Sequence, residues 1–143
     1  MENVIKVFCD GGSRGNPGRS AAAFVVQKNG RVIYSEAKYL GIATNNFAEY
    51  SAVLSALSWF RENKGLIKNE IVFFLDSELV VKQIKEDYKI KNKKLKTIFL
   101  EIKNLLAGFP PLRGRQKIIF KNISREKNKT ADILVNQKLD GVL

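Results

Sequence analysis

The sequence predicts an α/β fold in which a five-stranded mixed β-sheet is flanked by helices. Three apolar runs near the N-terminus have the length and boundaries of antiparallel strands: Val4–Cys9, Ala21–Gln27 and Val32–Leu40. The last two are joined by Asn29 and Gly30, the strongest short signal for a β-hairpin. Residues 46–60 then change to helical spacing. Residues 70–76 are apolar on both faces, which indicates a central strand with helices on either side.

The remaining elements alternate along the chain. The first helix ends before Gly65 and presents an apolar stripe at Val53, Ala56, Leu57 and Phe60. Ser77 is a good N-cap for a second helix. A third helix, a last strand and a last helix are expected at residues 95–106, 116–124 and 130–139. The order βββαβααβα, with helical crossovers that feed parallel strands after the three antiparallel ones, gives the mixed sheet.

Composition limits the number of domains, the compartment and the partners. The 143 residues, 45% of them hydrophobic, suffice for one well-buried core, so we expect a single domain at residues 1–143. The one cysteine, Cys9, is expected in that core and in a reducing compartment. No segment has the features of a signal peptide or a membrane helix, which favours the cytoplasm. The net charge of +11 favours a polyanionic partner such as nucleic acid.

Two aspartates follow strands that are expected in the centre of the sheet. Asp10 comes after the first apolar run and Asp76 after the doubly buried strand. In open α/β sheets this edge is where ligands bind, because the strand ends open onto a crevice. Each residue also has a purely structural interpretation. Asp76 would interact favourably with the following helix dipole, and Asp10 could be a turn residue before Gly11.

Two further acids lie on helix faces that point inward. Glu49 shares a stripe with the apolar residues of the first helix, where a carboxylate is costly unless it is paired or binds a cation. Asp132 repeats this pattern in the last helix, although an acid in a first turn is also favourable by itself. Four carboxylates around one crevice require divalent cations. The chain has no histidine and one cysteine, so Mg²⁺ or Mn²⁺ is expected rather than zinc.

Four segments in order resemble the motifs of the type 1 ribonucleases H. They read FCDGGSRGNPG, TNNFAEYSAVLSAL, LDSELVVKQI and REKNKTADILVNQ, and together they span nearly the whole chain. The resemblance is closest to the compact archaeal and bacterial forms. It implies the ribonuclease H-like fold and metal-dependent endonucleolytic cleavage of the RNA strand of RNA/DNA hybrids, which leaves 5′-phosphate and 3′-hydroxyl ends.

The same resemblance implies that two metal ions are held by the four acids. Asp10 would bridge both ions. The ion shared with Asp132 would activate the attacking water, and the ion held with Glu49 and Asp76 would stabilise the departing 3′-oxygen.

Substrate-binding residues are also implied by the resemblance. The loop with Gly11 and Gly12 would approach the minor groove of the hybrid, with the backbone freedom that glycines provide. Side-chain contacts to the two strands would come from Ser13, Asn16, Thr44, Asn45, Asn46 and Ser77. The alternative for Thr44 or Asn45 is that it only caps the helix that follows.

Two features depart from well-studied bacterial members of the family. Those proteins carry a histidine in the loop before the last acid, where this chain has Arg125. An arginine can position a phosphate but cannot transfer a proton near neutral pH. Longer bacterial enzymes insert a basic helix, and here seven lysines between Lys82 and Lys96 take that place. Both features could instead be solvated surface charges. Arg113 and Arg115 are expected to extend a positive rim.

The sequence therefore predicts a monomeric nuclease that acts on RNA/DNA hybrids without an obligate protein partner. One alternative is an inactive nucleic-acid-binding module on the same fold, since a fold does not guarantee a function. Another is a related nuclease, such as a resolvase, an exonuclease or an enzyme that also cuts double-stranded RNA.

Overall fold

The computed structural model describes residues 4–86, 88–109, 111 and 117–143. Its strands are β1 Val4–Arg14, β2 Gly18–Lys28, β3 Arg31–Ala43, β4 Glu70–Leu75 and β5 Ile118–Asn122. Its α-helices are α1 Asn45–Glu62, α2 Glu78–Ile84, α3 Lys93–Ala107 and α4 Lys129–Leu139. Two short 3₁₀-helices are η1 Lys64–Lys68 and η2 Arg125–Asn128. Among these described helices, none is both long and apolar enough to cross a bilayer.

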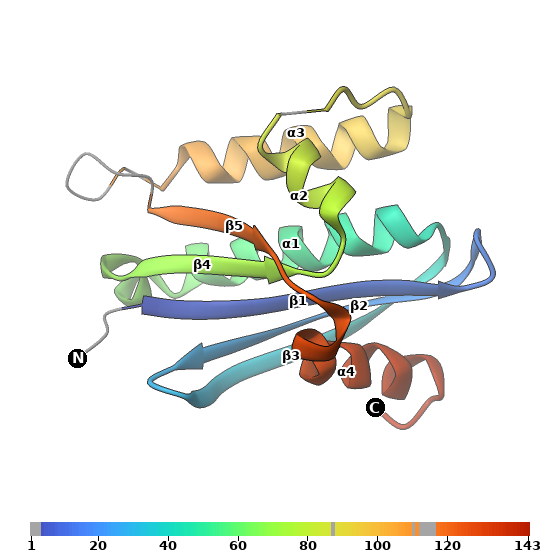
Figure 1. Cartoon of the computed structure of the whole chain (residues 1–143), viewed down its shortest axis with the longest axis horizontal. Helices are drawn as coiled ribbons and strands as arrows, with labels where there is room; N and C mark the ends of the chain where they lie inside the picture. Colours follow the sequence, from blue (N-terminus) through green and yellow to red (C-terminus); the bar gives the residue numbers. More distant parts are fainter. Residues whose placement is uncertain (1–3, 87, 110, 112–116) are drawn as a thin grey trace.

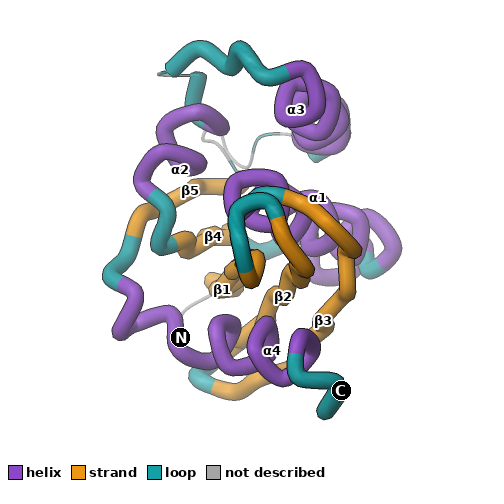
Figure 2. The backbone as a smooth tube through the Cα atoms, turned by 90° about the vertical axis from the view of Figure 1, so that its right-hand side faces the viewer, coloured by secondary structure: helices purple, strands orange, loops and turns teal. Residues whose placement is uncertain are grey.

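The strands form one mixed sheet in the order β3-β2-β1-β4-β5. Strands β1, β2 and β3 pair antiparallel, and β4 and β5 extend the sheet in parallel with β1. Figures 1 and 2 show α1 along one face of the sheet and α4 across the opposite face, with α2 and α3 above α1. The predicted fold class and element order are confirmed.

The main core lies between the sheet and α1. Its largest buried side chains include Phe24, Phe60 and Phe73, which are at most 1% exposed. Cys9 is fully buried in the same cluster, as predicted. A smaller cluster on the other face joins two alanines of β2 to Val135 and Leu139 of α4. The main cluster therefore packs α1 on one face of the sheet, and the smaller cluster packs α4 against β2 on the opposite face.

Strand β1 is longer than the sequence predicts. The apolar run ends at Cys9, but pairing with β2 continues through Gly11, Gly12 and Ser13 to Arg14. The chain then turns at residues 15–17, where Gly15 has a φ of 93° that favours glycine. On the other side of β1, the pairing with β4 stops at Cys9 opposite Leu75. Asp10 is therefore inside β1 and not at its end, yet it lies just beyond the end of the parallel pairing.

Gly11 is needed for the packing of α1 on β1. A Cβ atom at this position would lie 2.1 Å from the carbonyl carbon of Ala48 and 2.4 Å from the amide nitrogen of Glu49. The glycine therefore lets the helix backbone reach the strand backbone. Gly11 thus has a packing role that the sequence analysis did not identify, while its predicted contact with the substrate stays a prediction. Gly12 has no such neighbour, because its Cβ would make only an ordinary contact of 3.7 Å with Val135.

Candidate metal and nucleic-acid site

The predicted acids meet in one pocket at the edge of the sheet, which we call the acid pocket. It has a volume of about 520 Å³. Eleven of the thirteen predicted site residues line it: Asp10, Gly11, Gly12, Ser13, Asn45, Asn46, Glu49, Asp76, Ser77, Arg125 and Asp132. The sequence analysis did not include three further lining residues: Val135, Asn136 and Leu139. Segments from both ends of the chain therefore build this pocket.

Three carboxylates form the tightest group in the acid pocket. One oxygen each from Asp10, Glu49 and Asp76 lies within 4.8 Å of the other two. Asp10 projects from β1 beyond the last pair with β4, and Asp76 follows directly after β4. Glu49 lies one turn into α1, where Gly11 allows the helix to approach β1. Main-chain packing thus brings the three side chains together.

Burial and mutual repulsion make this group costly in the absence of a cation. Asp10 and Glu49 are each only 6% exposed. Burial, followed by the charges of Asp76 and Asp132, raises the pKa of Asp10 to about 7. Burial, followed by the charges of Asp10 and Asp76, raises the pKa of Glu49 well above its usual value. A divalent cation would offset both effects.

The donor set fits a hard divalent cation. Oxygen Oε2 of Glu49 is buried and has no hydrogen-bond partner among the described residues. Such an oxygen is expensive unless a ligand satisfies it. The group contains only carboxylate oxygens, which suit Mg²⁺ or Mn²⁺ better than zinc.

Asp132 lines the same pocket but is not part of the tight group. It stands in the first turn of α4, as predicted, and is half-buried. The side-chain nitrogen of Asn136 donates hydrogen bonds to the backbone carbonyl of Asp132 at 3.0 Å and to Oδ1 of Asp132 at 3.4 Å. The four acids therefore divide into three close carboxylates and a fourth that faces them from α4.

Asn128 is a buried residue of the site that the sequence analysis did not identify. It is 1% exposed, and its side-chain nitrogen donates to the carbonyl of Cys9 at 2.8 Å and to Oδ2 of Asp76 at 3.2 Å. Both partners are oxygens, so the amide nitrogen must face them. Asn128 is the N-cap residue of α4, but its side chain makes no capping hydrogen bond. It instead holds Asp76 toward β1.

We expect Asn128→Ala to lower the free energy of unfolding by about 1–3 kcal/mol, because it leaves the Cys9 carbonyl unsatisfied. It should also weaken Mg²⁺ binding about tenfold or more, because Asp76 loses the group that orients it. Thermal melts over a Mg²⁺ titration measure both effects. Asn122→Ala is the matched control, since the Asn122 side chain donates to the Leu75 carbonyl and, among the described residues, to no carboxylate of the site. Equal Mg²⁺ affinities in the two variants would contradict the role of Asn128.

Three of the residues that are predicted to contact the substrate form hydrogen bonds with one another. Oxygen Oδ1 of Asn45 accepts hydrogen bonds from the backbone nitrogen of Ser13 at 2.9 Å and from its hydroxyl at 3.1 Å. The backbone nitrogen of Asn45 donates to Oδ1 of Asn16 at 3.0 Å. This network ties the end of β1 and the following turn to the start of α1. It orders the rim of the acid pocket before any substrate arrives.

Thr44 and Ser77 cap helices. The hydroxyl of Thr44 accepts from the Phe47 nitrogen at 3.2 Å, and the hydroxyl of Ser77 accepts from the Val80 nitrogen at 3.2 Å. The capping interpretation therefore holds for Thr44 and not for Asn45. Thr44 also lines a second cavity of about 850 Å³ between β3, α1 and the start of α3, which we call the α3 groove.

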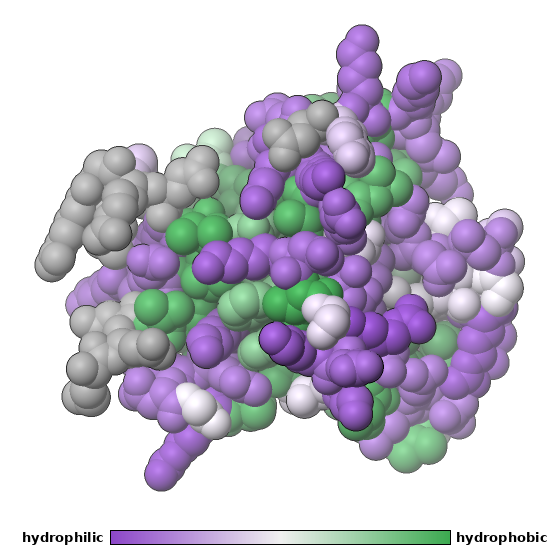
Figure 3. All heavy atoms as spheres, in the orientation of Figure 1, coloured by the Kyte–Doolittle hydropathy of each residue, from purple (hydrophilic) through white to green (hydrophobic). Residues whose placement is uncertain are grey.

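The basic residues surround these two cavities. Arg125, in η2, is exposed and lines the acid pocket. Lys38 and Lys94 line the α3 groove. Among the seven lysines between positions 82 and 96, Lys82 forms an ion pair with Glu78 at 2.9 Å, and the others are exposed. Figure 3 shows long hydrophilic side chains projecting from the upper end of the molecule, over the α2–α3 loop. Arg113 and Arg115 lie outside the described residues.

Comparison with known proteins agrees with this geometry. Residues 8–138 match the reverse transcriptase-like family. Ribonuclease HI from Halobacterium salinarum is 32% identical over 137 residues, which cover 95% of this chain and 64% of that protein. The structure of LC11-RNase H1, isolated from compost, superposes with a TM-score of 0.86 at 36% identity and 98% coverage of both chains. LC11-RNase H1 in complex with an RNA/DNA hybrid gives a TM-score of 0.85 at 35% identity, with 96% and 98% coverage.

The extent of the match differs among these proteins. The chain spans only 35% of the length of its mycobacterial curated relatives, but nearly all of the LC11-RNase H1 structure. The family match covers most of the chain, including all four acids of the acid pocket. The chain therefore belongs to the reverse transcriptase-like family and, within it, to the type 1 ribonucleases H.

Proposed function

We propose that the protein is a metal-dependent endoribonuclease that hydrolyses the RNA strand of RNA/DNA hybrids to 5′-phosphate and 3′-hydroxyl ends. The observation that carries this proposal is the group of three carboxylates within 4.8 Å, one with a buried oxygen that has no partner. The hybrid bound to LC11-RNase H1 supports the choice of substrate. We further propose that the protein acts as a monomer, because residues of one chain supply the lining of the acid pocket. The proposed compartment is the cytoplasm.

Asp10, Glu49 and Asp76 would hold Mg²⁺ or Mn²⁺, and Asp132 would share a second ion with Asp10. Bound ions would activate the attacking water and stabilise the negative charge on the departing oxygen. The carboxylates form no covalent bond with the substrate in this scheme. Their burial keeps them out of bulk water, where their attraction for a cation would be weak.

The other pocket residues would position the substrate. Arg125, at the mouth of the acid pocket, would bind a phosphate next to the cleaved bond; it cannot transfer a proton. Ser13 and Asn45, already ordered by their own hydrogen bonds, would face the minor groove where the 2′-hydroxyl distinguishes RNA from DNA. The DNA strand would lie along the α3 groove, where Thr44, Lys38 and Lys94 are available for its phosphates.

A cleavage assay tests the proposed function. The protein is incubated with an RNA/DNA hybrid, double-stranded RNA and double-stranded DNA, each with Mg²⁺, with Mn²⁺ or with EDTA. We expect cleavage of the RNA strand of the hybrid with either metal, no cleavage in EDTA and no cleavage of double-stranded DNA. Comparable cleavage of double-stranded RNA would identify the broader nuclease. Tight hybrid binding without any cleavage would identify the inactive module.

A further inference from the structure

One face of the sheet carries an aromatic pair that belongs to neither core cluster. Phe8 of β1 and Phe74 of β4 are direct neighbours across the parallel pairing. Their rings stack with centroids 5.1 Å apart and an angle of 20° between the ring planes. Both side chains are only half-buried. They point away from α1, because the alternate residues Val7 and Cys9 are fully buried in the core under that helix.

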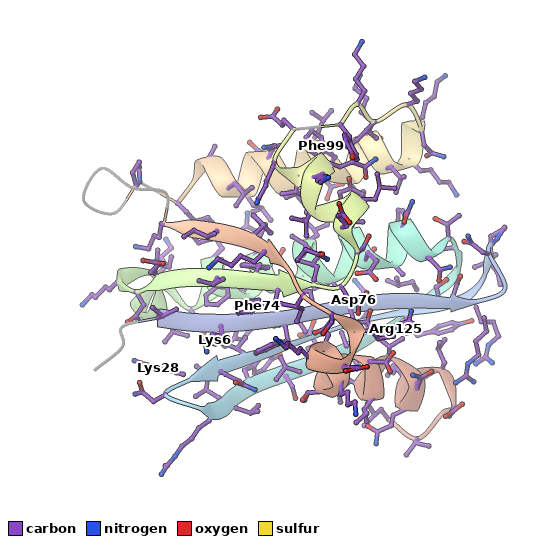
Figure 4. All side chains as sticks on the ribbon, in the orientation of Figure 1. Lys6, Lys28, Phe74, Asp76, Phe99 and Arg125 are labelled. Atoms are coloured by element: carbon purple, nitrogen blue, oxygen red, sulfur yellow. The ribbon has the colours of Figure 1, made fainter. Side chains whose placement is uncertain are left out.

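Lysines accompany the aromatic pair. The register places Lys121 of β5 beside Phe74, and Lys6 of β1 in the next row beside Val72. Both lysines are exposed. Figure 3 shows apolar residues gathered over β1, β4 and β5, crossed by hydrophilic side chains, and Figure 4 shows Lys6 and Phe74 on this front side. We call this surface, with Phe8, Phe74, Lys6, Lys121, Val72 and Ile119, the aromatic face.

The aromatic face lies next to the acid pocket. Phe8 precedes Asp10 by two residues on β1, and Phe74 precedes Asp76 by two residues at the end of β4, which is roughly 7 Å along the chain in each case. The segment between β5 and α4 passes between them, since the Ile123 nitrogen donates to the Leu75 carbonyl. A single nucleic-acid strand that leaves the acid pocket past this segment would therefore reach the aromatic face within a few nucleotides.

We propose that the aromatic face binds single-stranded nucleic acid, with one base stacked on Phe74 and the flanking phosphates on Lys6 and Lys121. Partly accessible aromatic rings beside cationic side chains are what such binding requires. A duplex cannot use the face in this way, because its bases are stacked on each other inside the helix. A second copy of this chain fits poorly, since a twofold contact would bring these lysines against themselves. This binding does not depend on the cleavage proposed above.

Fluorescence anisotropy in EDTA, where metal-dependent cleavage is absent, tests this proposal. The probe is a labelled thymidine oligomer of about 12 nucleotides, compared with an abasic oligomer of the same length. We expect Phe74→Leu to weaken binding of the thymidine oligomer about fivefold or more, and to leave binding of the abasic oligomer unchanged. Phe99→Leu, on α3, is the matched control and should change neither.

The lysines are tested by a charge-matched pair of variants. Lys6→Gln with Lys121→Gln should weaken binding of both oligomers and reduce the slope of log K against log salt by about 1.4. Lys64→Gln with Lys68→Gln removes the same charge from η1 and should change affinity by less than about twofold. All four variants should cleave a blunt RNA/DNA hybrid at the wild-type rate if the wild type cleaves it.

Three results would overturn the aromatic face as a nucleic-acid site. The first is unchanged affinity for the thymidine oligomer in Phe74→Leu. The second is equal loss of affinity in the two lysine pairs, which would show unspecific attraction by the net charge. The third is a concentration-dependent dimer in sedimentation velocity that Phe74→Leu dissociates. Each is independent of whether the hybrid is cleaved, so failure of this proposal can be told from failure of the proposed function.

Discussion

Asp10→Asn should abolish hybrid cleavage and at the same time raise the melting temperature of the metal-free protein. Asp10 is the acid that would bridge both ions, so its loss should reduce the cleavage rate by at least about a thousandfold. In the metal-free state the same side chain is buried among like charges, and asparagine keeps its shape without its charge. One substitution is therefore expected to have opposite effects on activity and on stability.

The gain in stability should depend on pH. In the folded protein the pKa of Asp10 is raised to about 7, whereas an unfolded chain has an aspartate pKa of about 3.9. The wild type therefore loses stability as the pH rises from about 4 to about 7, since folding requires an acid that is already ionised in the unfolded chain to take up a proton. The stabilisation by Asp10→Asn should be full above pH 7, on the order of 4 kcal/mol, and absent below about pH 4.

Thermal melts at several pH values, with EDTA or about 10 mM Mg²⁺, measure this prediction. Mg²⁺ should stabilise the wild type and leave Asp10→Asn unchanged. Glu62→Gln, which removes an exposed acid at the end of α1, is the control and should change neither the metal-free stability nor the Mg²⁺ shift. An undiminished Mg²⁺ shift in Asp10→Asn would refute the assignment of Asp10 as a ligand.

The second large effect is expected from Gly11→Ala. The new methyl group would lie 2.1 to 2.4 Å from backbone atoms of Ala48 and Glu49, which cannot rotate away. Helix α1 would have to move off β1, which would open the core. We expect a loss of more than about 3 kcal/mol of unfolding free energy, since this exceeds ordinary overpacking. Glu49 would move with the helix, so any folded fraction should also bind Mg²⁺ weakly.

Gly12→Ala is the matched control for this experiment. It adds the same methyl group one residue later, at an ordinary distance of 3.7 Å from Val135. Its unfolding free energy should change by less than about 1 kcal/mol. Urea unfolding monitored by circular dichroism compares both variants with the wild type. If Gly11→Ala proved as stable as Gly12→Ala, the close packing of α1 on β1 would be wrong.

The sequence predicted those features that depend on local periodicity. The burial of Glu49 followed from its place on an apolar helical stripe, and the position of Asp76 followed from the apolar strand before it. The mixed sheet, with three antiparallel strands followed by parallel ones, followed from the hairpin signal and the helical crossovers. Each of these patterns depends on the residue spacing within one helix or strand, and tertiary contacts did not override that local preference.

Features that depend on distant partners were missed. The extension of β1 through Gly11 and Gly12 has no apolar alternation of its own and is fixed by pairing with β2. The close packing of Gly11 depends on Ala48, 37 positions further along the chain. Asn128 donates to Cys9 across 119 residues, and nothing in the segment around it marks that contact. Such roles become visible only when the elements are assembled.

The contact of α1 with β1 has a consequence for how this protein could change. The separation between Asp10 and Glu49 depends on the contact between two backbones, at Gly11 of β1 and Ala48 of α1. Replacement of surface segments away from this contact, such as residues 88–92, would thus alter which polymer is bound while the three carboxylates kept their separation. Engineering of new substrate preferences should start at those peripheral segments and leave the helix–strand junction untouched.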